Sequence, residues 1–550
     1  MGRIVVIGGG PGGSCAATML ARSGHSVLVL EREHFPRDHV GESLLPASVP
    51  ILEALGVRDE VEASGALRKW GATMVWGRER EPWSWYFRET NTTYPHAYQV
   101  WRPTFDQILL RNAAAAGAEV REGVRVTSVL VEPGEDAERV VGLRWVDETG
   151  VEGVERPDLV LDASGQAAVV GRALGLRRFD RDFRNMAVYA YYDGAGRLDP
   201  PDETNILVEA YADGWCWVIP LPGGRASVGA VVDQGRAAGG GVRGDDLAGF
   251  LDAELTKTDH ARRLLAGARR ERDRAPVALR DWSYVSDRVV GDGFILVGDA
   301  ACFVDPLFSS GVHLALTAGM LAAAYVTTAL DDTELGAAAR PVYQELYYSQ
   351  YGRFHEMAKL FYASNRTDRS HYWKARRALG AVADGGDKAA RLAFVRAVAG
   401  QPPQGYERAV LAQGELPAEF AAAVDAVEAE LARRKATAVD LGDRLGAAVP
   451  VGAADTRIER RPVLEGDRFV WGHSLVSASR TEGVPLSPLV AALVNAIDGA
   501  RTVDALIGDV LGPLGIADQR REPLAENLRF ALVTLFVDGA IAELRVGTDG

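Results

Sequence analysis

The stretch IVVIGGGPGGSCAATMLARSGHSVLVLER, residues 4–32, decides the fold of this chain. Ile4–Ile7 is a short β-branched run, which is typical of a buried parallel strand. Ser14–Arg22 consists of helix-forming residues, and the apolar run Val27–Leu30 follows it and leads into Glu31 and Arg32. The pattern therefore predicts a strand, a helix and a second strand at the start of an α/β fold.

Three glycines at fixed spacing connect the first predicted strand to the helix. Gly8 permits a tight turn, Gly10 lets the backbone approach a pyrophosphate, and Gly13 permits close packing of helix on strand. The helix N-terminus then faces the phosphates, and Glu31 is placed to bind a ribose hydroxyl. Because these features occur in order, the sequence predicts a dinucleotide site.

Composition limits the class of protein. The 550 residues allow about two to four domains. The net charge of −14 argues against binding to nucleic acid or to an anionic membrane. Cys15, Cys216 and Cys302 are widely separated and lack metal-ligand spacing, so we expect no metal site. With no signal peptide in view, we expect a cytoplasmic protein with reduced thiols.

One segment, Gly311–Leu330, is apolar enough to suggest a membrane span. His313 and several threonines interrupt it, and a strand-and-loop motif comes directly before it. We therefore predict a buried core helix.

Two later strands end in residues suited to a dinucleotide. Leu159–Gly165 ends in Asp162 and Gly165, and the strand Phe294–Val297 ends in Gly298 and Asp299. An acid at the carboxyl end of a parallel strand can hold a sugar hydroxyl.

Several other segments are rich in β-forming residues. Glu119–Val131 and Val140–Asp147 are antiparallel in character. Four further runs fit a sheet that covers a substrate: Ala187–Tyr192, Asn205–Tyr211, Gly214–Leu221 and Ala226–Val232. In the third run, Trp215 and Trp217 are predicted to point to the same face, which by itself is typical of a core.

An arginine-rich stretch follows this predicted sheet. We expect Gly240–Arg280 to be helical. Such a run is usually a solvated face, but on an acidic chain it can also be a dock for an acidic partner. The candidate docking residues are Arg262, Arg263, Arg269, Arg270, Arg272 and Arg274.

The remaining chain is expected to be helical and charged from Asp331 to Lys435, with a looser stretch at Gly442–Asp455. Pro485–Leu544 predicts three or four short helices with a strand, in a winged-helix-like arrangement. We predict a core at 1–350 with a substrate-covering sheet at 183–290, a helical region at 351–450 and a small domain at 451–550.

Taken together, these motifs resemble those of the FAD enzymes built like para-hydroxybenzoate hydroxylase. The resemblance implies FAD as the dinucleotide, and an α/β fold with a Rossmann-like FAD domain, a β-sheet substrate region and a mostly helical carboxyl-terminal domain. Arg102 matches a family arginine that leans on the cofactor, and Ser43 lies where the chain would pass back over the flavin. The implied FAD-binding residues are Gly8, Gly10, Gly13, Glu31, Arg32, Ser43, Arg102, Asp162, Gly165, Gly298, Asp299, Pro306 and Gly311.

Within that class, the chain resembles the flavin-dependent halogenases of antibiotic pathways, a group that includes the chloramphenicol one. Its WCWVIP segment matches the family motif W-x-W-x-I-P, through Trp215, Trp217, Ile219 and Pro220, which would wall the flavin site. Lys69 stands where the family has its catalytic lysine, and the amides of Ser310 and Gly311 match the family halide site. Asp305, just before that loop, is either a structural cap or a flavin contact.

The resemblance also implies a reaction. Reduced FAD from a separate reductase reacts with O₂ to a C4a-hydroperoxide, which oxidises chloride or bromide to hypohalous acid, and Lys69 delivers the halogen. Free-tryptophan enzymes carry a catalytic glutamate where this chain has Phe308. An electron-rich phenol or pyrrole, or an activated acyl group tethered to a carrier protein, is therefore favoured as substrate. An FAD monooxygenase and a non-catalytic flavoprotein are the alternatives.

Overall fold

The computed structural model describes residues 1–76, 80–134, 137–180, 183–233, 246–280, 283–364, 418–477 and 480–546. These residues form two compact units. The first comprises 1–327 and 347–364, and the second 328–346 and 418–546. This division differs from the predicted boundaries at 350 and 450, because part of the helix after Asp331 packs with the carboxyl-terminal unit. Much of the predicted helical region, residues 365–417, lies outside the described residues.

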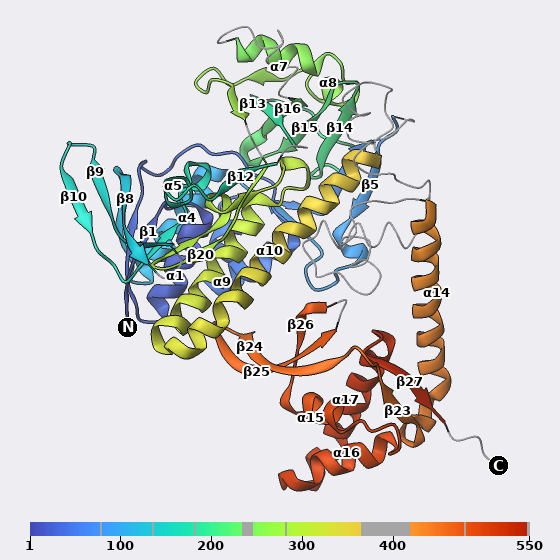
Figure 1. The fold of residues 1–550 in the computed structure, drawn as a ribbon. Helices are drawn as coiled ribbons and strands as arrows, with labels where there is room; N and C mark the ends of the chain where they lie inside the picture. The colour runs from blue at the N-terminus through green and yellow to red at the C-terminus, as the bar shows by residue number, and fades with distance from the viewer. Residues whose placement is uncertain are drawn as a thin grey trace. The chain divides into compact units, whose positions relative to one another are not determined.

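The first unit is built on a mostly parallel six-stranded sheet (Figure 1). The β1 strand pairs in parallel with β2 on one side and β11 on the other, so the predicted strands are confirmed. In spatial order the strands are β20 (Val290–Gly291), β21 (Phe294–Leu296), β11 (Leu159–Asp162), β1 (Arg3–Ile7), β2 (Ser26–Leu30) and β7 (Glu119–Arg121). The helices of this region are α1 (Pro11–Arg22), α2 (Val49–Leu55), α3 (Arg58–Ala63), α4 (Arg102–Ala115) and α5 (Val169–Ala173).

An eight-stranded sheet forms the second layer of this unit. It contains the four predicted strands, and it also takes β4 and β5 from a much earlier part of the chain, outside 183–290. Its strands in order are β17 (Arg269–Arg270), β13 (Asn185–Asp193), β16 (Arg225–Asp233), β15 (Gly214–Pro220), β14 (Ile206–Tyr211), β4 (Gly71–Val75) and β5 (Trp83–Tyr86), with β18 (Val277–Arg280) paired to β13.

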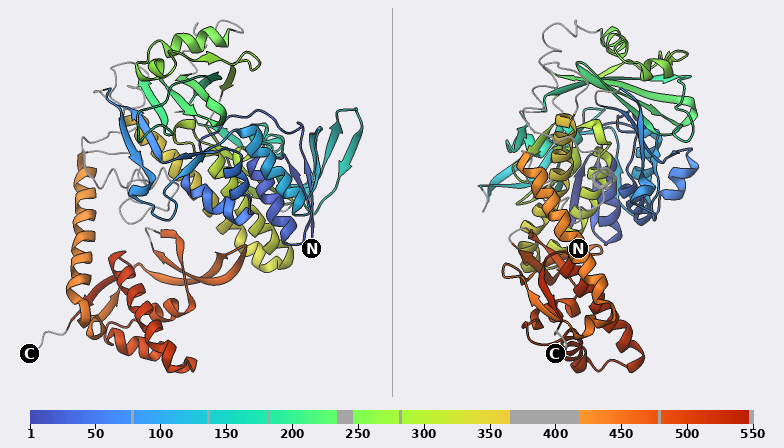
Figure 2. Two further views of the ribbon diagram at one scale, coloured as in Figure 1. Left: turned by 180° about the vertical axis from the view of Figure 1, so that it is seen from behind. Right: turned by 90° about the vertical axis from the view of Figure 1, so that its right-hand side faces the viewer.

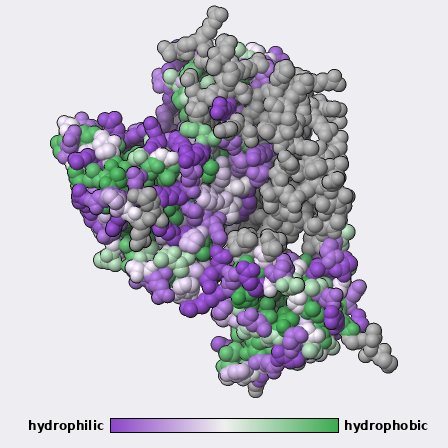
Figure 3. Space-filling view, viewed as in Figure 1, coloured by the Kyte–Doolittle hydropathy of each residue, from purple (hydrophilic) through white to green (hydrophobic). Residues whose placement is uncertain are grey.

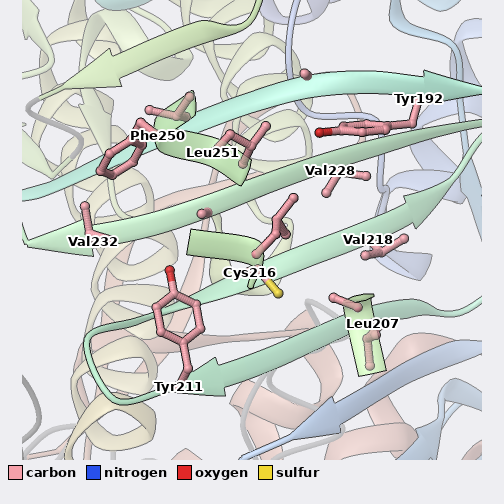
Figure 4. Packing of buried hydrophobic residues seen from close by; sticks show 14 of the residues in the cluster. Tyr192, Leu207, Tyr211, Cys216, Val218, Val228, Val232, Phe250 and Leu251 are labelled. Atoms are coloured by element: carbon pink, nitrogen blue, oxygen red, sulfur yellow. The ribbon is translucent and has the colours of Figure 1, made fainter. Parts of the chain in front are cut away.

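One face of the eight-stranded sheet carries its own apolar core, which faces α7 (Leu247–Leu255) and α8 (His260–Leu264). Cys216 and Val218 point into this core with Phe250 and Leu251 of α7 (Figure 4). The views of Figure 2 agree that α7 and α8 lie on the face away from the six-stranded sheet. Strand alternation therefore sends Trp215, Trp217 and Ile219 to the opposite face, toward the six-stranded sheet.

The prediction that Gly240–Arg280 is helical is wrong for its second half. Within the described residues, α7 ends at Leu255 and α8 at Leu264, and the chain then forms β17 and β18 at the edge of the sheet. On the side away from β16, the backbone groups of β13 need partners. Pairing with Arg269–Arg270 and Val277–Arg280 satisfies them, and this outweighs the helical propensity of residues 265–280.

Three smaller sheets complete the first unit. The antiparallel prediction at Glu119–Val131 holds only from Val124 onward, since β7 joins the parallel sheet. The strands are β8 (Val124–Gly134), β9 (Ala137–Asp147) and β10 (Glu152–Glu155); then β12 (Arg177–Phe179), β19 (Tyr284–Ser286) and β22 (Cys302–Phe303); and β3 (Leu67–Lys69) with β6 (Ala97–Gln99). In the sheet formed by β8, β9 and β10, Val131 and Val154 are exposed, as is Val151 just before β10. Hydrophobic residues of this sheet show in green at the left of Figure 3.

The long apolar segment forms α9 (Gly311–Asp331), and α10 (Thr333–Ser364) follows it. Among the described residues α9 is the one helix long and apolar enough to cross a membrane, but 78% of its most apolar window is buried inside the protein. Such burial is typical of a core helix.

The second unit has its own apolar core around Leu506, Leu532 and Phe536. The predicted helices and strand at Pro485–Leu544 are present as α15, α16, α17 and β27. Its elements are α14 (Ala418–Leu441), β23 (Val449–Gly452), β24 (Arg457–Glu465), β25 (Arg468–Ser477), β26 (Arg480–Leu486), α15 (Pro488–Ala496), α16 (Val503–Leu511), α17 (Asp518–Val537) and β27 (Ile541–Arg545).

Candidate active site

A cavity of about 480 Å³ lies in the first unit, where the two large sheets meet. This volume falls within the range of about 300 to 1,000 Å³ expected of small-molecule sites. Most residues proposed from sequence line it: Gly8, Gly10, Glu31, Arg32, Ser43, Arg102, Gly165, Trp215, Trp217, Ile219, Gly298, Asp299, Pro306, Ser310 and Gly311. The fold thus brings together segments that are 300 residues apart in the chain.

The glycine loop has the geometry that its sequence predicts. Gly8 has a φ of +100°, and a Cβ there would lie 2.5 Å from the Ala163 carbonyl oxygen. A Cβ on Gly13 would lie 2.0 Å from the Gly8 oxygen, so Gly13 packs beneath the loop rather than lining the cavity. The loop leads into α1, whose first residues, Pro11 and Gly12, line the cavity. Glu31, at the end of β2, accepts the Gly9 amide at 2.7 Å.

Asp162 does not reach the cavity, contrary to the sequence prediction. Its buried carboxylate accepts the backbone amides of Ser164, at 3.1 Å, and Val170, at 2.7 Å. It holds the turn that brings Gly165 to the cavity wall. Pro220, at the end of β15, also lies outside the lining.

Burial shifts the pKa of two acids in the cavity lining, Asp299 and Glu42. Burial raises the pKa of Asp299 to about 7. Burial also raises the pKa of Glu42, although the hydrogen bond that its carboxylate accepts from the Tyr191 hydroxyl, at 2.8 Å, opposes this. Sequence reasoning assigned Glu42 no role, because its partner Tyr191 is 149 residues away.

A buried ion pair fixes Arg102 at the cavity wall. Arg102 donates two hydrogen bonds to Asp106, at 2.7 and 2.8 Å, and Arg37 lies 3.6 Å from the same carboxylate. Burial alone would raise the pKa of Asp106, but the two arginines hold it below its usual range. Arg37 lines the cavity next to Gly10, where a Cβ would lie 3.3 Å from its guanidinium. No local pattern pointed to Arg37, which lies in a loop of ordinary composition.

Lys69 lies outside this cavity, at the end of β3, and is only 2% exposed. Its amine donates to the Leu44 carbonyl at 3.2 Å and lies 5.4 Å from the centre of the Phe87 ring. Among the described residues it has no ion-pair partner. Burial alone lowers its pKa to about 7.

Two buried oxygens share the face of β3 and β6 that carries Lys69. Gln99 is on the same face because it pairs with Leu67, two residues before Lys69, and Ser43 pairs with Gln99 in an isolated bridge. The Ser43 hydroxyl and the Gln99 amide oxygen have no hydrogen-bond partner among the described residues. Ser43 also lines the cavity, so this face of β3 and β6 adjoins the cavity at Ser43.

The Pro306–Gly311 segment forms the cavity wall at the start of α9. Asp305 caps it by accepting the Leu307 amide at 2.9 Å, so its role as a structural cap is confirmed. Phe308 is buried, and Ser309 has a φ of +58°. Ser310 and Gly311 follow, where the first amides of a helix have no partner within the helix.

The glycine loop, the acid after β2 and the cavity under a mostly antiparallel sheet define an FAD enzyme of the para-hydroxybenzoate-hydroxylase class. A family model described as tryptophan halogenase matches residues 3–95 and 86–427. The chain therefore belongs to the tryptophan halogenase family, and it is a flavin-dependent halogenase.

The relatives support this assignment. The tryptophan 2-halogenase of Chondromyces crocatus is 38% identical over 379 residues, which cover 68% of this chain and 70% of the relative. The myxobacterial chondrochloren halogenase CndH shares 40% identity at a TM-score of 0.65, over 73% of this chain and 90% of that one. The flavin-dependent halogenase CmlS shares 28% identity at a TM-score of 0.73, over 100% and 98%.

Proposed function

We propose that this halogenase transfers oxidised halide through the neutral amine of Lys69 to an electron-rich aromatic or activated acyl substrate. The observation that carries this proposal is the amine itself. It is buried without a carboxylate partner among the described residues, and its pKa is lowered to about 7. An amine in that state is a nucleophile at neutral pH, whereas an arginine would stay charged.

The residues around the cavity fit FAD. Added Cβ atoms at Gly8 and Gly13 would collide with backbone, so the tight turn and the close packing of this dinucleotide-binding loop require glycine. Glu31 would hold a ribose hydroxyl, Arg37 the pyrophosphate charge, and Asp299 a ribityl hydroxyl. When bound in its reduced form, FAD supplies two electrons that, with O₂, a proton and halide, yield hypohalous acid and water.

The amides of Ser310 and Gly311 are the proposed halide site. They open α9 at the cavity wall, where partly positive backbone N–H groups favour an anion without a charged side chain. The Trp215, Trp217 and Ile219 side chains supply an apolar wall across the same cavity. Such a wall limits water near the reacting halide and strengthens its attraction to the amides.

Transfer to Lys69 is a balanced substitution. The amine nitrogen attacks the halogen of hypohalous acid, the N–X bond forms as the X–O bond breaks, and the amine proton leaves with hydroxide as water. The aromatic carbon then takes the halogen and loses its proton, which restores the amine. We assign the unpartnered oxygens of Ser43 and Gln99 to hydrogen bonding with the acid on its way to Lys69.

The chain's own residues also favour a substrate that is already activated. Phe308 stands where a catalytic acid would otherwise be, and it is buried and apolar. The relative in Pseudomonas fluorescens named 1H-pyrrole-2-carbonyl-(peptidyl-carrier protein) chlorinase is 30% identical over 66% of this chain and 84% of its own length. That likeness supports a carrier-tethered pyrrole or phenol as a candidate substrate here.

A carrier would dock on a smaller arginine surface than the sequence predicts. Arg270 pairs with Asp252, and Arg274 with Asp38 and Glu271, so both are half-buried and already paired. The exposed members are Arg262, Arg263, Arg269 and Arg272. We retain these four as the docking surface for an acidic partner.

The test combines the protein with FAD, a flavin reductase, NADH, O₂ and chloride or bromide. Phenols, pyrroles and their carrier-bound thioesters are offered, and the products are read by mass and isotope pattern. We expect a halogen pattern that disappears in Lys69→Met while flavin oxidation continues, and that persists in the exposed-lysine control Lys435→Met. Oxygen insertion without halide dependence would contradict the proposal.

A further inference from the structure

Four buried polar side chains from separate parts of the first unit form one hydrogen-bonded group beside the cavity. Asn185 begins β13, Trp215 lies in β15, Asp305 precedes the Pro306–Phe308 turn, and Tyr362 lies in the last turn of α10. None of the four is more than 2% exposed. We call them the Tyr362 cluster.

The Tyr362 hydroxyl connects the other members. It accepts the Trp215 indole N–H at 2.7 Å and donates to Asp305 Oδ2 at 3.0 Å. Asn185 Nδ2 donates to the same carboxylate oxygen at 3.2 Å and lies 3.4 Å from the hydroxyl. An indole can only donate and an ionised carboxylate can only accept, so a group that does both is needed between them.

The other oxygen of Asp305 faces the halide segment. Oδ1 accepts the Leu307 amide at 2.9 Å and so fixes the start of the Pro306–Phe308 turn. Ser309, a non-glycine residue at a φ of +58°, then turns the chain into Ser310 and Gly311. A residue in that region keeps its conformation only where its surroundings impose it. The direction of the Ser310 and Gly311 amides therefore depends on how firmly Asp305 is held.

We propose that Tyr362 is a positioning residue for halide binding. Its hydroxyl holds the Asp305 carboxylate so that the 306–311 segment presents the Ser310 and Gly311 amides to the halide. The inference rests on the proposed halide site. It also gives α10 a role in the chemistry, because the helix sends one hydroxyl between Trp215 of the eight-stranded sheet and Asp305.

Tyr362→Phe tests this inference with little change in packing. Ring contacts to Trp76 and Phe183, at centroid distances of 6.1 and 5.4 Å, would remain. We expect the apparent KM for bromide to rise about tenfold, equivalent to about 1.4 kcal/mol, with kcat at saturating bromide within about twofold of wild type. Amide hydrogen exchange in the 303–312 peptide should accelerate.

The matched control is Tyr192→Phe, which removes a buried hydroxyl on the opposite face of the same sheet, where it accepts from Arg270 at 3.3 Å. It should change neither readout. Asp305→Asn should act in the same direction as Tyr362→Phe and provides a second variant. An unchanged bromide KM with unchanged exchange, or a fall in kcat alone, would overturn the inference. If the wild type halogenates nothing with any halide, the proposed function fails, and the exchange measurement still decides whether Tyr362 holds the segment.

Discussion

Lys69 should titrate near pH 7, and this can be observed directly. The ordinary lysine pKa of 10.5 is lowered to about 7 by burial. A difference of about 3.5 pKa units means that the fold disfavours the ammonium form by about 5 kcal/mol. At pH 7 the neutral fraction of the amine accordingly rises from about 3 in 10,000 to about one half.

The assay is NMR of the protein labelled with ¹³C at lysine Cε, which is practical because the chain has only six lysines. We expect one signal with a midpoint near pH 7. Lys69→Met should remove the low-pH signal, and Lys435→Met should remove one of the others. If all signals titrate near pH 10, the argument from burial is refuted.

The same pKa sets the pH dependence of turnover. If the neutral amine takes the halogen, the halogenation rate should rise about tenfold per pH unit below 7 and level off above it. A rate that falls through pH 7 would instead identify the ammonium as a hydrogen-bond donor. Stability follows with the same sign: between pH 7 and 10.5 the unfolded chain binds more protons, so the folded protein gains stability as pH rises.

Three other changes test the remaining parts of the site. Ser43→Ala combined with Gln99→Leu removes the two unpartnered oxygens. The amount of halogenated product per flavin oxidised, measured by mass spectrometry, should fall about threefold or more, and the hypohalous acid trapped in solution should increase. Glu42→Gln removes a carboxyl whose pKa is raised by burial above its value in the unfolded chain. Such a carboxyl makes the folded protein less stable as pH rises, so the variant should raise Tm more at pH 8 than at pH 5. Reversing Arg262 and Arg263 to Glu should raise the KM of a carrier-bound substrate about tenfold and leave the KM of a free substrate unchanged. Added salt should likewise raise the KM of the carrier-bound substrate alone. Equal effects on both substrates would reject the docking surface.

Local patterns predicted the parts of the fold that depend on local physics. The glycine loop follows from the spacing of Gly8 and Gly13, and the alternation in β15 placed Trp215 and Trp217 on one face. The pattern alone favoured a core for that face, but the resemblance assigned it to the flavin wall, and the structure places it on the cavity. Nothing local could show that Asp162 turns away from the cavity to bind two amides of its own loop.

Long-range partners were beyond sequence reasoning. Tyr362 joins Trp215 across 147 residues, and nothing near Tyr362 in the sequence distinguishes it from the other tyrosines of α10. The entry of β4 and β5 into the substrate sheet was missed for the same reason, since β4 pairs in parallel with β14 far along the chain. The edge pairing that turned Arg269–Arg270 into a strand is likewise a property of the neighbour, β13.

The short link between β3 and β4 has a consequence for building chimeric enzymes. Lys69 ends one sheet and Gly71 begins another, with one residue between them. A Cβ at Gly71 would lie 1.9 Å from the Trp85 carbonyl oxygen, so the junction tolerates no side chain there. A graft limited to 183–290 would leave the donor sheet without β4 and β5, the last two strands at one edge. Residues 71–86 must be exchanged with it, and Lys69 then lies two residues from the seam.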